Sequence, residues 1–408
     1  MKITLQKYNL LPEHLNFDLK KIVEKHLNDD LNTLAFKFKS TDQTDFNTNL
    51  VLESVSNIKK GSNKLPTLTS NYCWLPTKSY EQASSELTAF YKSLLFEGNA
   101  VLDLCGGLGV DDIAFSKVFS TVVSLDADEE LNEIVKFNFK KLGINHIERI
   151  TVFAEDFIAN NTSKFDLVYI DADRRPAVNS KKYLLSDCTP NIIELLPQLK
   201  QITHQLLIKL SPMVDLNYCK SEIENIKEIH VVSLKNEVKE VLLLVDFSIL
   251  QSTITKAVNI INDKNIHEFS DINSFEIETK DSKVNNDYFY EPNASIIKAN
   301  LSANYAQSLG LKMIALNSNF FVGDIFIENF YGRCFKIIDS FMFSKSILKS
   351  YLKNNGIIKA NISKRNFPIN EIEIAKQFNL KTGGDEYLFF TQNNQGEKLF
   401  FHCRKNQI

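Results

Sequence analysis

Five short apolar runs between residues 100 and 210 constrain the fold of this chain more than any other feature. They span 100–104, 122–125, 150–153, 167–170 and 206–210, and the segments between them have helical spacing. Strands and helices that alternate in this way form a parallel sheet covered by helices on both faces. Two further runs, 230–234 and 241–247, are separated only by a short polar turn, which predicts an antiparallel hairpin. The sequence therefore predicts an α/β sheet of parallel strands that ends in a hairpin.

The remaining parts of the chain have other patterns. Residues 1–70 have helical spacing and predict an N-terminal helical region, and residues 81–97 predict a helix that leads into the sheet domain, 71–250. Residues 251–287 are mostly polar and are interpreted as a linker. A helix after Pro292 and short strands are expected in 288–330, and 331–408 predicts a small α+β module that ends in a hairpin.

Composition and charge limit the class of protein. The 408 residues suffice for several domains, and the six Cys and seven His show no metal-ligand spacing, so no metal site is expected. The sequence has no apolar run of membrane-spanning length and no signal peptide, which predicts a cytoplasmic protein without a membrane partner. Residues 331–408 hold 13 basic and 6 acidic residues, whereas 1–330 hold 34 and 44. A basic end on an acidic body can mark a nucleic-acid partner, or it can be a solvated lysine face.

A glycine-rich segment follows the first apolar run. The strand 101–104 leads directly into a turn and then a helix, so the backbone can approach a ligand where no Cβ intrudes. The residues expected to bind a cofactor here are Asp103, Cys105, Gly106, Gly107 and Gly109.

The same segment distinguishes between two kinds of cofactor. A dinucleotide fingerprint needs a small residue three positions after Gly109, and that position is Asp112. The carboxylates of Asp111 and Asp112 at the start of the helix would repel a pyrophosphate. S-adenosylmethionine (SAM), whose sulfonium is a cation, suits this acidic loop better. Asp111 could bind that ligand or cap the helix.

Later strand ends carry further candidates. Asp126 follows the second run, where a carboxylate can accept hydrogen bonds from both ribose hydroxyls. Asp156 and the neighbouring Phe157 follow the third run and could contact an adenine. Asp171 ends the fourth run, and ligands of open α/β sheets bind at the carboxyl ends of the strands. All four residues are therefore expected to bind the cofactor.

The residues after the fourth run constrain the acceptor chemistry. Asp171 or Asp173 could orient the acceptor or take its proton, and both are candidate catalytic residues. The segment lacks the proline and aromatic residue typical of exocyclic-amine methylation. Cys188 lies 17 residues after Asp171, too distant in sequence to be a clear nucleophile for carbon methylation.

Two basic pairs could contact substrate phosphates. Arg174 and Arg175 follow the candidate catalytic residues, and Lys364 and Arg365 lie in the basic C-terminal module. The first pair could equally form salt bridges with the neighbouring carboxylates.

Several motifs carry a resemblance. The sequence resembles bacterial class I methyltransferases with a C-terminal THUMP-like domain at 82–86, the glycine loop, 171–175, 290–293 and 383–387. The resemblance implies a Rossmann-like SAM-binding sheet, a ferredoxin-like segment at 288–330 and a THUMP-like domain at 331–408. THUMP domains occur in RNA-modifying enzymes, so it also implies an RNA substrate, either tRNA or rRNA.

The resulting hypothesis is a SAM-dependent RNA methyltransferase. One alternative is a methyltransferase of a protein or small molecule, whose THUMP-like part only packs against the catalytic domain. Another is an RNA-binding protein with a degenerate cofactor site.

Overall fold

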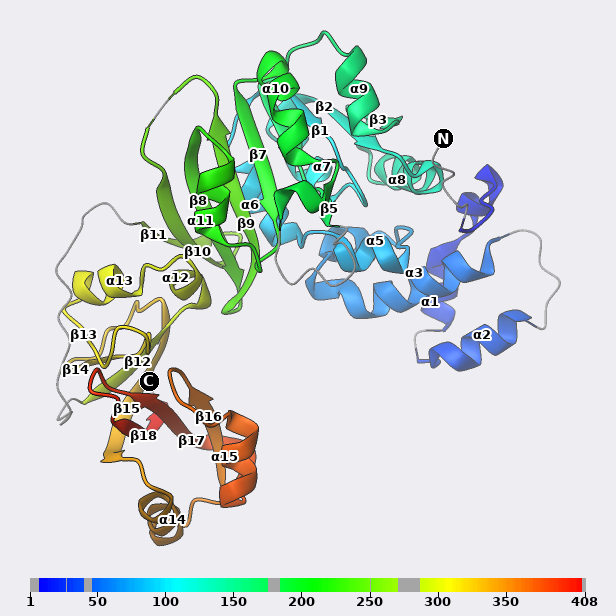
Figure 1. The fold of residues 1–408 in the computed structure, drawn as a ribbon. Coiled ribbons are helices and arrows are strands. Elements are labelled where there is room, and N and C mark those ends of the chain that lie inside the picture. The colour runs from blue at the N-terminus through cyan, green and yellow to red at the C-terminus, as the bar shows by residue number, and fades with distance from the viewer. Residues whose placement is uncertain are drawn as a thin grey trace. The chain divides into compact units, whose positions relative to one another are not determined.

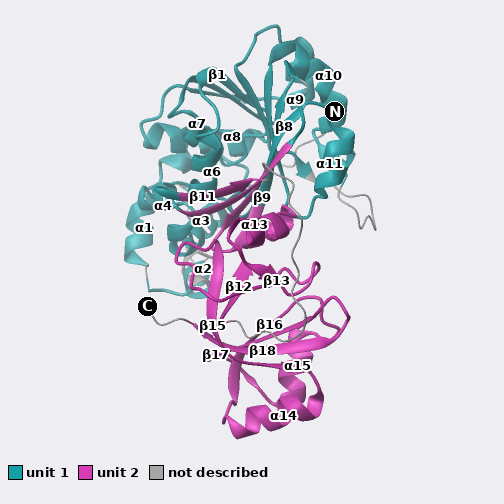
Figure 2. Cartoon of the chain, turned by 90° about the vertical axis from the view of Figure 1, so that its left-hand side faces the viewer, with its two compact units in different colours: residues 1–229, 240–253, 262–265 teal, residues 230–239, 254–261, 266–408 magenta. Residues whose placement is uncertain are grey.

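The computed structural model describes residues 7–26, 28–39, 46–174, 184–249, 251–270 and 287–405. The chain forms two compact units (Figure 2). Unit 1 comprises residues 1–229, 240–253 and 262–265, and unit 2 comprises 230–239, 254–261 and 266–408. Within the described ranges, no helix is long and apolar enough to cross a membrane.

The N-terminal part of unit 1 is helical. Its elements are η1 (Pro12–Asn16), α1 (Leu19–Lys25), α2 (Leu31–Lys39), α3 (Thr48–Lys60), η2 (Gly61–Asn63), α4 (Pro66–Ser70), α5 (Thr77–Gln82) and α6 (Glu86–Ser93). The indole of the buried Trp74 donates to the carbonyl of Leu15 (3.1 Å), and its backbone exchanges two hydrogen bonds with the amide of Asn138 (2.9 Å each). Asn138 belongs to α8 (Glu129–Lys141), so the N-terminal helices share one hydrophobic core with the sheet domain.

The helix predicted over 81–97 is interrupted. α5 ends at Gln82 and α6 begins at Glu86, because the hydroxyl of Ser85 accepts a hydrogen bond from the backbone N–H of Thr88 (3.2 Å) and caps α6. Serine at this position favours a new N-terminus over a continuous helix. Because the helix is interrupted, Ser84 lies between α5 and α6 and can contact the candidate site described below.

A nine-stranded sheet has the order β11-β10-β8-β9-β7-β4-β1-β2-β3 (Figure 1). Its parallel strands are β1 (Gly98–Asp103), β2 (Phe119–Asp126), β3 (Ile147–Thr151), β4 (Leu167–Ile170) and β7 (Gln205–Leu210). The elements between them are α7 (Val110–Phe115), α8, α9 (Ala154–Asn160), β5 (Asp173–Arg174), η3 (Leu185–Asp187), β6 (Cys188–Thr189) and α10 (Ile192–Ile202), and α11 (Leu216–Glu222) follows β7. β4 is buried along its whole length, as a central strand covered on both faces must be.

The predicted terminal hairpin is confirmed. β8 (Ile226–Leu234) and β9 (Glu237–Asp246) are neighbours in the sheet, and β9 pairs antiparallel with β7. Lys235 and Asn236 between them have φ of 53° and 63°. Positive φ at both residues is the geometry of a tight type I′ hairpin turn.

The linker predicted over 251–287 is wrong for part of its length. Residues 254–270 form β10 (Ile254–Asn262) and β11 (Asn265–Ser270), which extend the sheet beyond β8. Ala257, Val258 and Ile260 are buried within a segment whose composition is polar overall. Residues 271–286 lie outside the described ranges.

Unit 2 contains a seven-stranded sheet with the order β13-β14-β12-β15-β18-β17-β16. Its elements are β12 (Tyr288–Pro292), α12 (Ala294–Lys298), α13 (Ser302–Ser308), β13 (Lys312–Met313), β14 (Phe321–Gly323), β15 (Gly332–Met342), α14 (Lys345–Asn354), β16 (Lys359–Lys364), α15 (Glu371–Phe378), β17 (Lys381–Gln392) and β18 (Lys398–Lys405). β12 pairs antiparallel with β15, so the segment 288–330 and residues 332–405 contribute to one sheet.

Aromatic side chains form the core of this second sheet. Phe289 of β12 stacks on Phe389 of β17 with ring centroids 4.3 Å apart, and Phe320 packs against both. All three rings are completely buried. α14 and α15 cover a second apolar cluster that includes Phe390 and Phe400.

Candidate functional site

Three of the predicted carboxylates meet at one edge of the first sheet. Asp103 ends β1, Asp126 ends β2 and Asp171 follows β4, and β1 pairs in parallel with both β2 and β4. The structure therefore brings these side chains together at the carboxyl edge, where ligands of such sheets bind. Asp156 is exposed and Phe157 is half-buried in the first turns of α9, after the neighbouring strand β3.

The glycine loop connects two of these carboxylates. The backbone N–H of Cys105 donates to Asp103 Oδ1 (2.8 Å), and that of Gly107 donates to Asp126 Oδ2 (3.0 Å). Gly107 has a φ of 49°, and a Cβ added there would have only the carbonyl of Cys105 within 4 Å, at 3.9 Å. Gly109 has a φ of 77°, and a Cβ there would lie 2.5 Å from the ring of Phe139. The loop thus packs closely at Gly109 and is open at Gly107.

Arg149 of β3 supports the loop. Its Nη1 donates to Asp112 Oδ2 (3.0 Å) and to Ser124 Oγ (2.8 Å), and its Nη2 donates to the carbonyl of Gly107 (2.6 Å). A Cβ at Gly106 would lie 2.1 Å from both Nη1 and Ser124 Oγ. Gly106 is therefore required by the packing of the buried guanidinium. Arg149 is not predicted from the sequence, because a single arginine in a short strand carries no motif.

Asp103 and Asp112 place two carboxyl groups under the loop, with exposed fractions of 1% and 0%. Burial raises the pKa of Asp103 well above its usual value, and the charge of Asp112 raises it further. Burial also raises the pKa of Asp112, against the opposing effect of Arg149. Burial and the surrounding carboxylates raise the pKa of the Cys105 thiol, so this cysteine is not an activated nucleophile.

Asp111 belongs to a buried charge cluster. Its carboxylate accepts hydrogen bonds from Ser84 Oγ and Tyr169 OH (2.9 Å each), and its Oδ1 lies 3.0 Å from Lys92 Nζ. Lys92 is completely buried and also pairs with Glu240 (3.1 Å). Burial raises the pKa of Asp111, but the nearby ammonium groups, Lys92 first, outweigh it and the pKa is lowered. Asp111 therefore does not cap α7, and its carboxylate already has protein partners.

The predicted catalytic carboxylates have protein partners. Asp171 Oδ2 accepts a hydrogen bond from Lys209 Nζ (2.5 Å), and Asp173 Oδ1 accepts one from Gln82 Nε2 (3.2 Å). Burial lowers the pKa of Lys209, but the charges of Asp171 and Glu240 outweigh it and raise the pKa above its ordinary value. Lys209 is thus a cation at neutral pH. Lys92, Lys209 and Glu240 are not predicted from the sequence, because no motif in their own segments marks them as part of a site.

The predicted substrate-binding residues lie in two places. Arg174 ends β5, and Arg175 lies outside the described residues. Lys364 ends β16, and its Nζ donates to the carbonyl of Phe367 (3.1 Å).

Arg365 has several partners within unit 2. Its Nη2 donates to Glu291 Oε1 (3.0 Å), and its Nη1 donates to the carbonyl of Asn319 (2.9 Å). The guanidinium also lies over the ring of Phe320, 4.8 Å from the centroid. Glu291 binds Arg333 as well, so one buried carboxylate joins two arginines.

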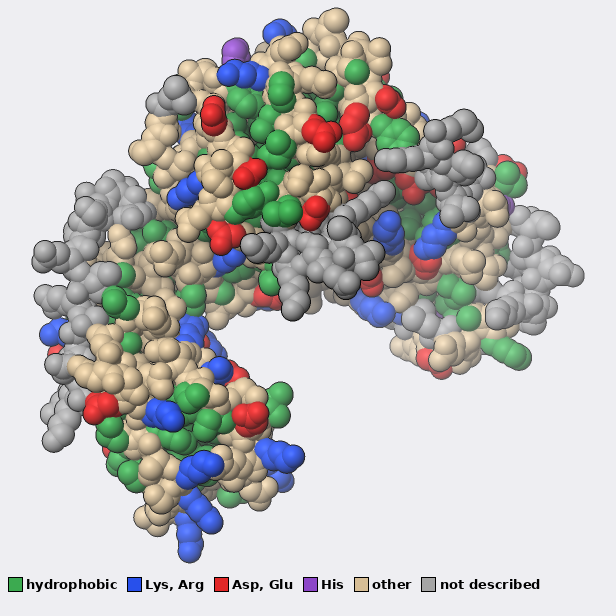
Figure 3. Space-filling view, in the orientation of Figure 1, with side chains coloured by type: hydrophobic (Ala, Val, Ile, Leu, Met, Phe, Trp, Pro, Cys, Tyr) green, Lys and Arg blue, Asp and Glu red, His purple; other side chains and the backbone are tan. Residues whose placement is uncertain are grey.

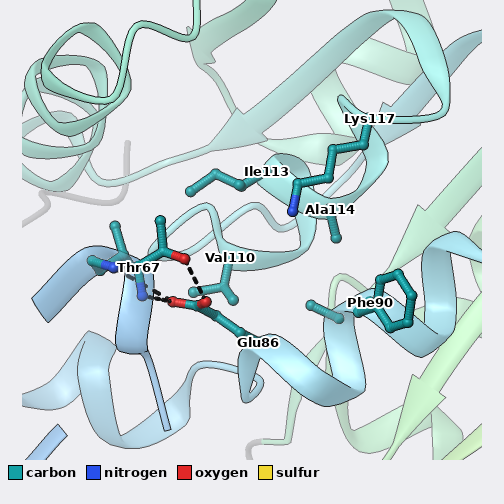
Figure 4. A pocket seen from close by; sticks show the side chains of 9 residues that line it. Thr67, Glu86, Phe90, Val110, Ile113, Ala114 and Lys117 are labelled. Carbon is teal, nitrogen blue, oxygen red and sulfur yellow. Dashed lines mark hydrogen bonds between the residues drawn. The ribbon is translucent and has the colours of Figure 1, made fainter. Parts of the chain in front are cut away.

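A pocket lies elsewhere in unit 1, between α4, α6 and α7 (Figure 4). Phe90, Val110 and Ile113 contribute to its apolar lining. Glu86 accepts hydrogen bonds there from the backbone N–H and the hydroxyl of Thr67 (2.7 Å each). None of the predicted site residues lines this pocket.

Two family models match consecutive parts of unit 2. Residues 332–405 match the model of the THUMP domain-like family, and residues 288–330 match the model of a ferredoxin-like domain. No curated protein sequence matches the chain.

One solved structure matches nearly the whole chain. It is described as a "putative methyltransferase" from Porphyromonas gingivalis W83, with 27% identity, 97% of this chain and 98% of that chain covered, and a TM-score of 0.84. Two partial matches are an rRNA methylase from Streptococcus thermophilus (15% identity, 41% and 95% covered, TM-score 0.31) and M. capricolum TrmK with S-adenosyl-homocysteine (17%, 42% and 71%, 0.32). The sheet topology, the match to the P. gingivalis structure and the two family models together give the chain a class I methyltransferase sheet followed by ferredoxin-like and THUMP-like parts.

Proposed function

We propose that this protein is a cytoplasmic SAM-dependent methyltransferase whose substrate is tRNA or rRNA. The observation that carries the proposal is the meeting of Asp103, Asp126 and Asp171 with an open glycine loop at the carboxyl edge of the sheet. The fold match to the P. gingivalis protein along nearly the whole chain supports the same activity.

The residues at this edge fit SAM better than a dinucleotide. Asp103, Asp126 and Asp171 place carboxyl groups where a sulfonium and an amino group would need negative charge, and a cationic ligand favours their ionised forms. Gly107 leaves space beside the loop, since almost nothing lies within 4 Å of a Cβ there. Asp156 and Phe157, after β3, are the candidates for the adenine. SAM supplies an activated methyl group when bound.

The protein then has to align the acceptor and manage one proton. Asp171 is the better candidate of the two acidic residues, because its Oδ2 is held by Lys209 (2.5 Å) and its Oδ1 has no hydrogen-bond donor among the described residues. Asp173 is exposed and bound to Gln82, so it is the weaker candidate.

The RNA part of the proposal rests on unit 2. Residues 332–405 match the THUMP domain-like family, and residues 331–408 carry 13 basic against 6 acidic residues. THUMP domains occur in RNA-modifying enzymes, and a basic module suits a phosphate backbone.

One observation favours a different substrate. Arg365, a predicted phosphate contact, is bound to Glu291 and half-enclosed by Phe320. A methyltransferase of a protein or small molecule would leave such residues to structural roles. Its substrate affinity would be insensitive to salt, whereas affinity for RNA falls steeply as salt rises.

Two measurements test the proposal. Calorimetry with SAM should detect binding by the wild-type protein and none by Asp103→Ala, with the exposed Asp263→Ala as a control that keeps wild-type affinity. Mass spectrometry of nucleosides in tRNA and rRNA from a strain that lacks the protein should reveal one missing methylated nucleoside, restored by the purified protein and SAM. Unchanged nucleosides in the RNA of that strain would favour the protein or small-molecule substrate. If Asp103→Ala kept both SAM binding and methylation, the site would be refuted.

A further inference from the structure

One helix of unit 2 carries a row of lysines on its surface. Lys345, Lys349 and Lys353 recur every four residues along α14, so they lie on one face of the helix, about 6 Å apart in rise. All three are exposed, while Leu348 and Leu352, on the adjoining side of the helix, are buried in the core. Figure 3 shows Lys and Arg side chains projecting from the region where Figure 1 draws α14.

The helix itself supplies no negative charge to this face. The sequence of α14, KSILKSYLKN, contains no Asp or Glu, and none of its three lysines forms an ion pair within the described residues. Some other cations of unit 2 do: Lys336 pairs with Asp287 (3.2 Å) and Arg404 with Glu386 (2.7 Å). Three like charges at spacings of four residues repel one another in the absence of an anionic partner. An anion bound along this face would relieve that repulsion.

We propose that the Lys345–Lys349–Lys353 face of α14 is the surface that binds the phosphate backbone of the RNA substrate. The inference rests on the proposed function and names the part of the chain that holds the substrate. Lysines on a single helix face can each neutralise one phosphate without reading the sequence. The exposed Ser346 and Ser350 add hydroxyl donors next to the lysines.

The apolar side of α14 favours RNA over a membrane. A helix that lies on a lipid surface must insert its apolar face into the bilayer. Here Leu348 and Leu352 are 0% and 6% exposed and pack with Phe390 and Phe400 under the helix. α14 thus offers a partner its three lysines, whereas its leucines are not available to a bilayer and, of the residues described in this helix, only Ile347, 42% exposed, adds a large apolar side chain to its surface.

The test replaces all three lysines by glutamine in the full-length protein. Fluorescence anisotropy with labelled total tRNA and, separately, with labelled rRNA, measured at several salt concentrations, gives the affinity and its salt slope. We expect the triple variant to lose affinity at least ~10-fold at 0.1 M salt and its slope to fall by about 2–3, since each phosphate contact contributes roughly 0.7–0.9 to the slope. A Lys→Arg triple variant keeps the charges and should restore both values.

The control removes the same charge from unit 1. Lys20, Lys21 and Lys25 are exposed on α1, and their replacement by glutamine should leave affinity and slope near wild type. Equal losses in the two triple variants would mean a non-specific charge effect and overturn the assignment of α14.

The other outcomes separate this inference from the proposed function. If the wild-type protein binds tRNA with a steep slope and the α14 variant binds equally well, the surface is wrong and the RNA substrate stands. If the wild-type protein binds neither tRNA nor rRNA, the RNA substrate itself is refuted. Binding to phosphatidylserine vesicles that the α14 variant loses would replace RNA by a membrane as the partner.

Discussion

Substitution of Gly106 by alanine tests whether Arg149 supports the cofactor loop. The new Cβ would lie 2.1 Å from both Arg149 Nη1 and Ser124 Oγ, a distance that real Cβ atoms do not reach. The guanidinium cannot yield cheaply, because it is almost completely buried and bound to Asp112 (3.0 Å) and to the carbonyl of Gly107 (2.6 Å). Separating a buried ion pair costs about 3–5 kcal/mol. Gly106→Ala should therefore cost unit 1 this amount of folding free energy.

Gly107→Ala is the matched control. It adds the same methyl group one residue away, where nothing lies closer than the Cys105 carbonyl at 3.9 Å. Only its positive φ of 49° opposes the change, which costs roughly 1–2 kcal/mol.

Differential scanning calorimetry separates the two variants. For a unit of this size, 1 kcal/mol corresponds to a shift in Tm of roughly 2–4 °C. The transition of unit 1 should fall by about 6 °C or more in Gly106→Ala and by roughly half as much or less in Gly107→Ala. Equal shifts in the two variants would refute the view that Arg149 dictates the glycine at 106.

Three further changes are expected to have defined effects. Lys92→Met should lower the stability of unit 1 by about 3–5 kcal/mol in thermal unfolding, because the buried carboxylates of Asp111 and Glu240 lose the ammonium group that pairs with both. Adding Glu240→Gln to this variant should recover part of the lost stability. The affinity for SAM should rise with pH and binding should release a proton, because the pKa of Asp103 is raised in the free protein and a cationic ligand favours its ionised form. Calorimetry in buffers of different ionisation enthalpy measures the number of protons released. A pH-independent affinity without proton release would contradict the prediction. Glu291→Gln should lower the Tm of unit 2 and leave that of unit 1 unchanged, because the charge joining Arg333 and Arg365 is lost; a shift in unit 1 would argue against a local role.

The predictable parts of this structure are those specified by neighbouring residues. Each apolar run predicts its own strand, and Asp103, Asp126 and Asp171 each follow a run directly, so the parallel topology suffices to bring them to one edge. The hairpin of β8 and β9 is equally local, since two residues of positive φ join its strands.

The parts that the sequence does not predict depend on contacts between distant residues. Lys92 and Glu240 are 148 positions apart in the chain, and no pattern in either segment indicates the other. Arg149 lies 42 residues from the loop that it supports. Only a few residues of the strands at 254–270 are buried, among them Val258 and Ile260, so most of the segment is polar and resembles a linker. The burial of those few residues depends on the neighbouring strand β8.

The proposed function requires two ligands of opposite charge, and this has a consequence for how the substrate is held. Asp103, Asp126 and Asp171 suit a cationic cofactor, but the same carboxylates repel a phosphate backbone. Arg149 and Lys209 do not reverse this effect, because each is held against a carboxylate. The affinity for RNA then has to come from charges outside this edge, such as the exposed lysines of α14. Asp126→Asn should therefore weaken SAM binding without weakening RNA binding. The triple glutamine variant of α14 should weaken RNA binding without weakening SAM binding. Calorimetry with SAM and anisotropy with tRNA measure both affinities on the same two proteins, and loss of both ligands by either variant would contradict this separation.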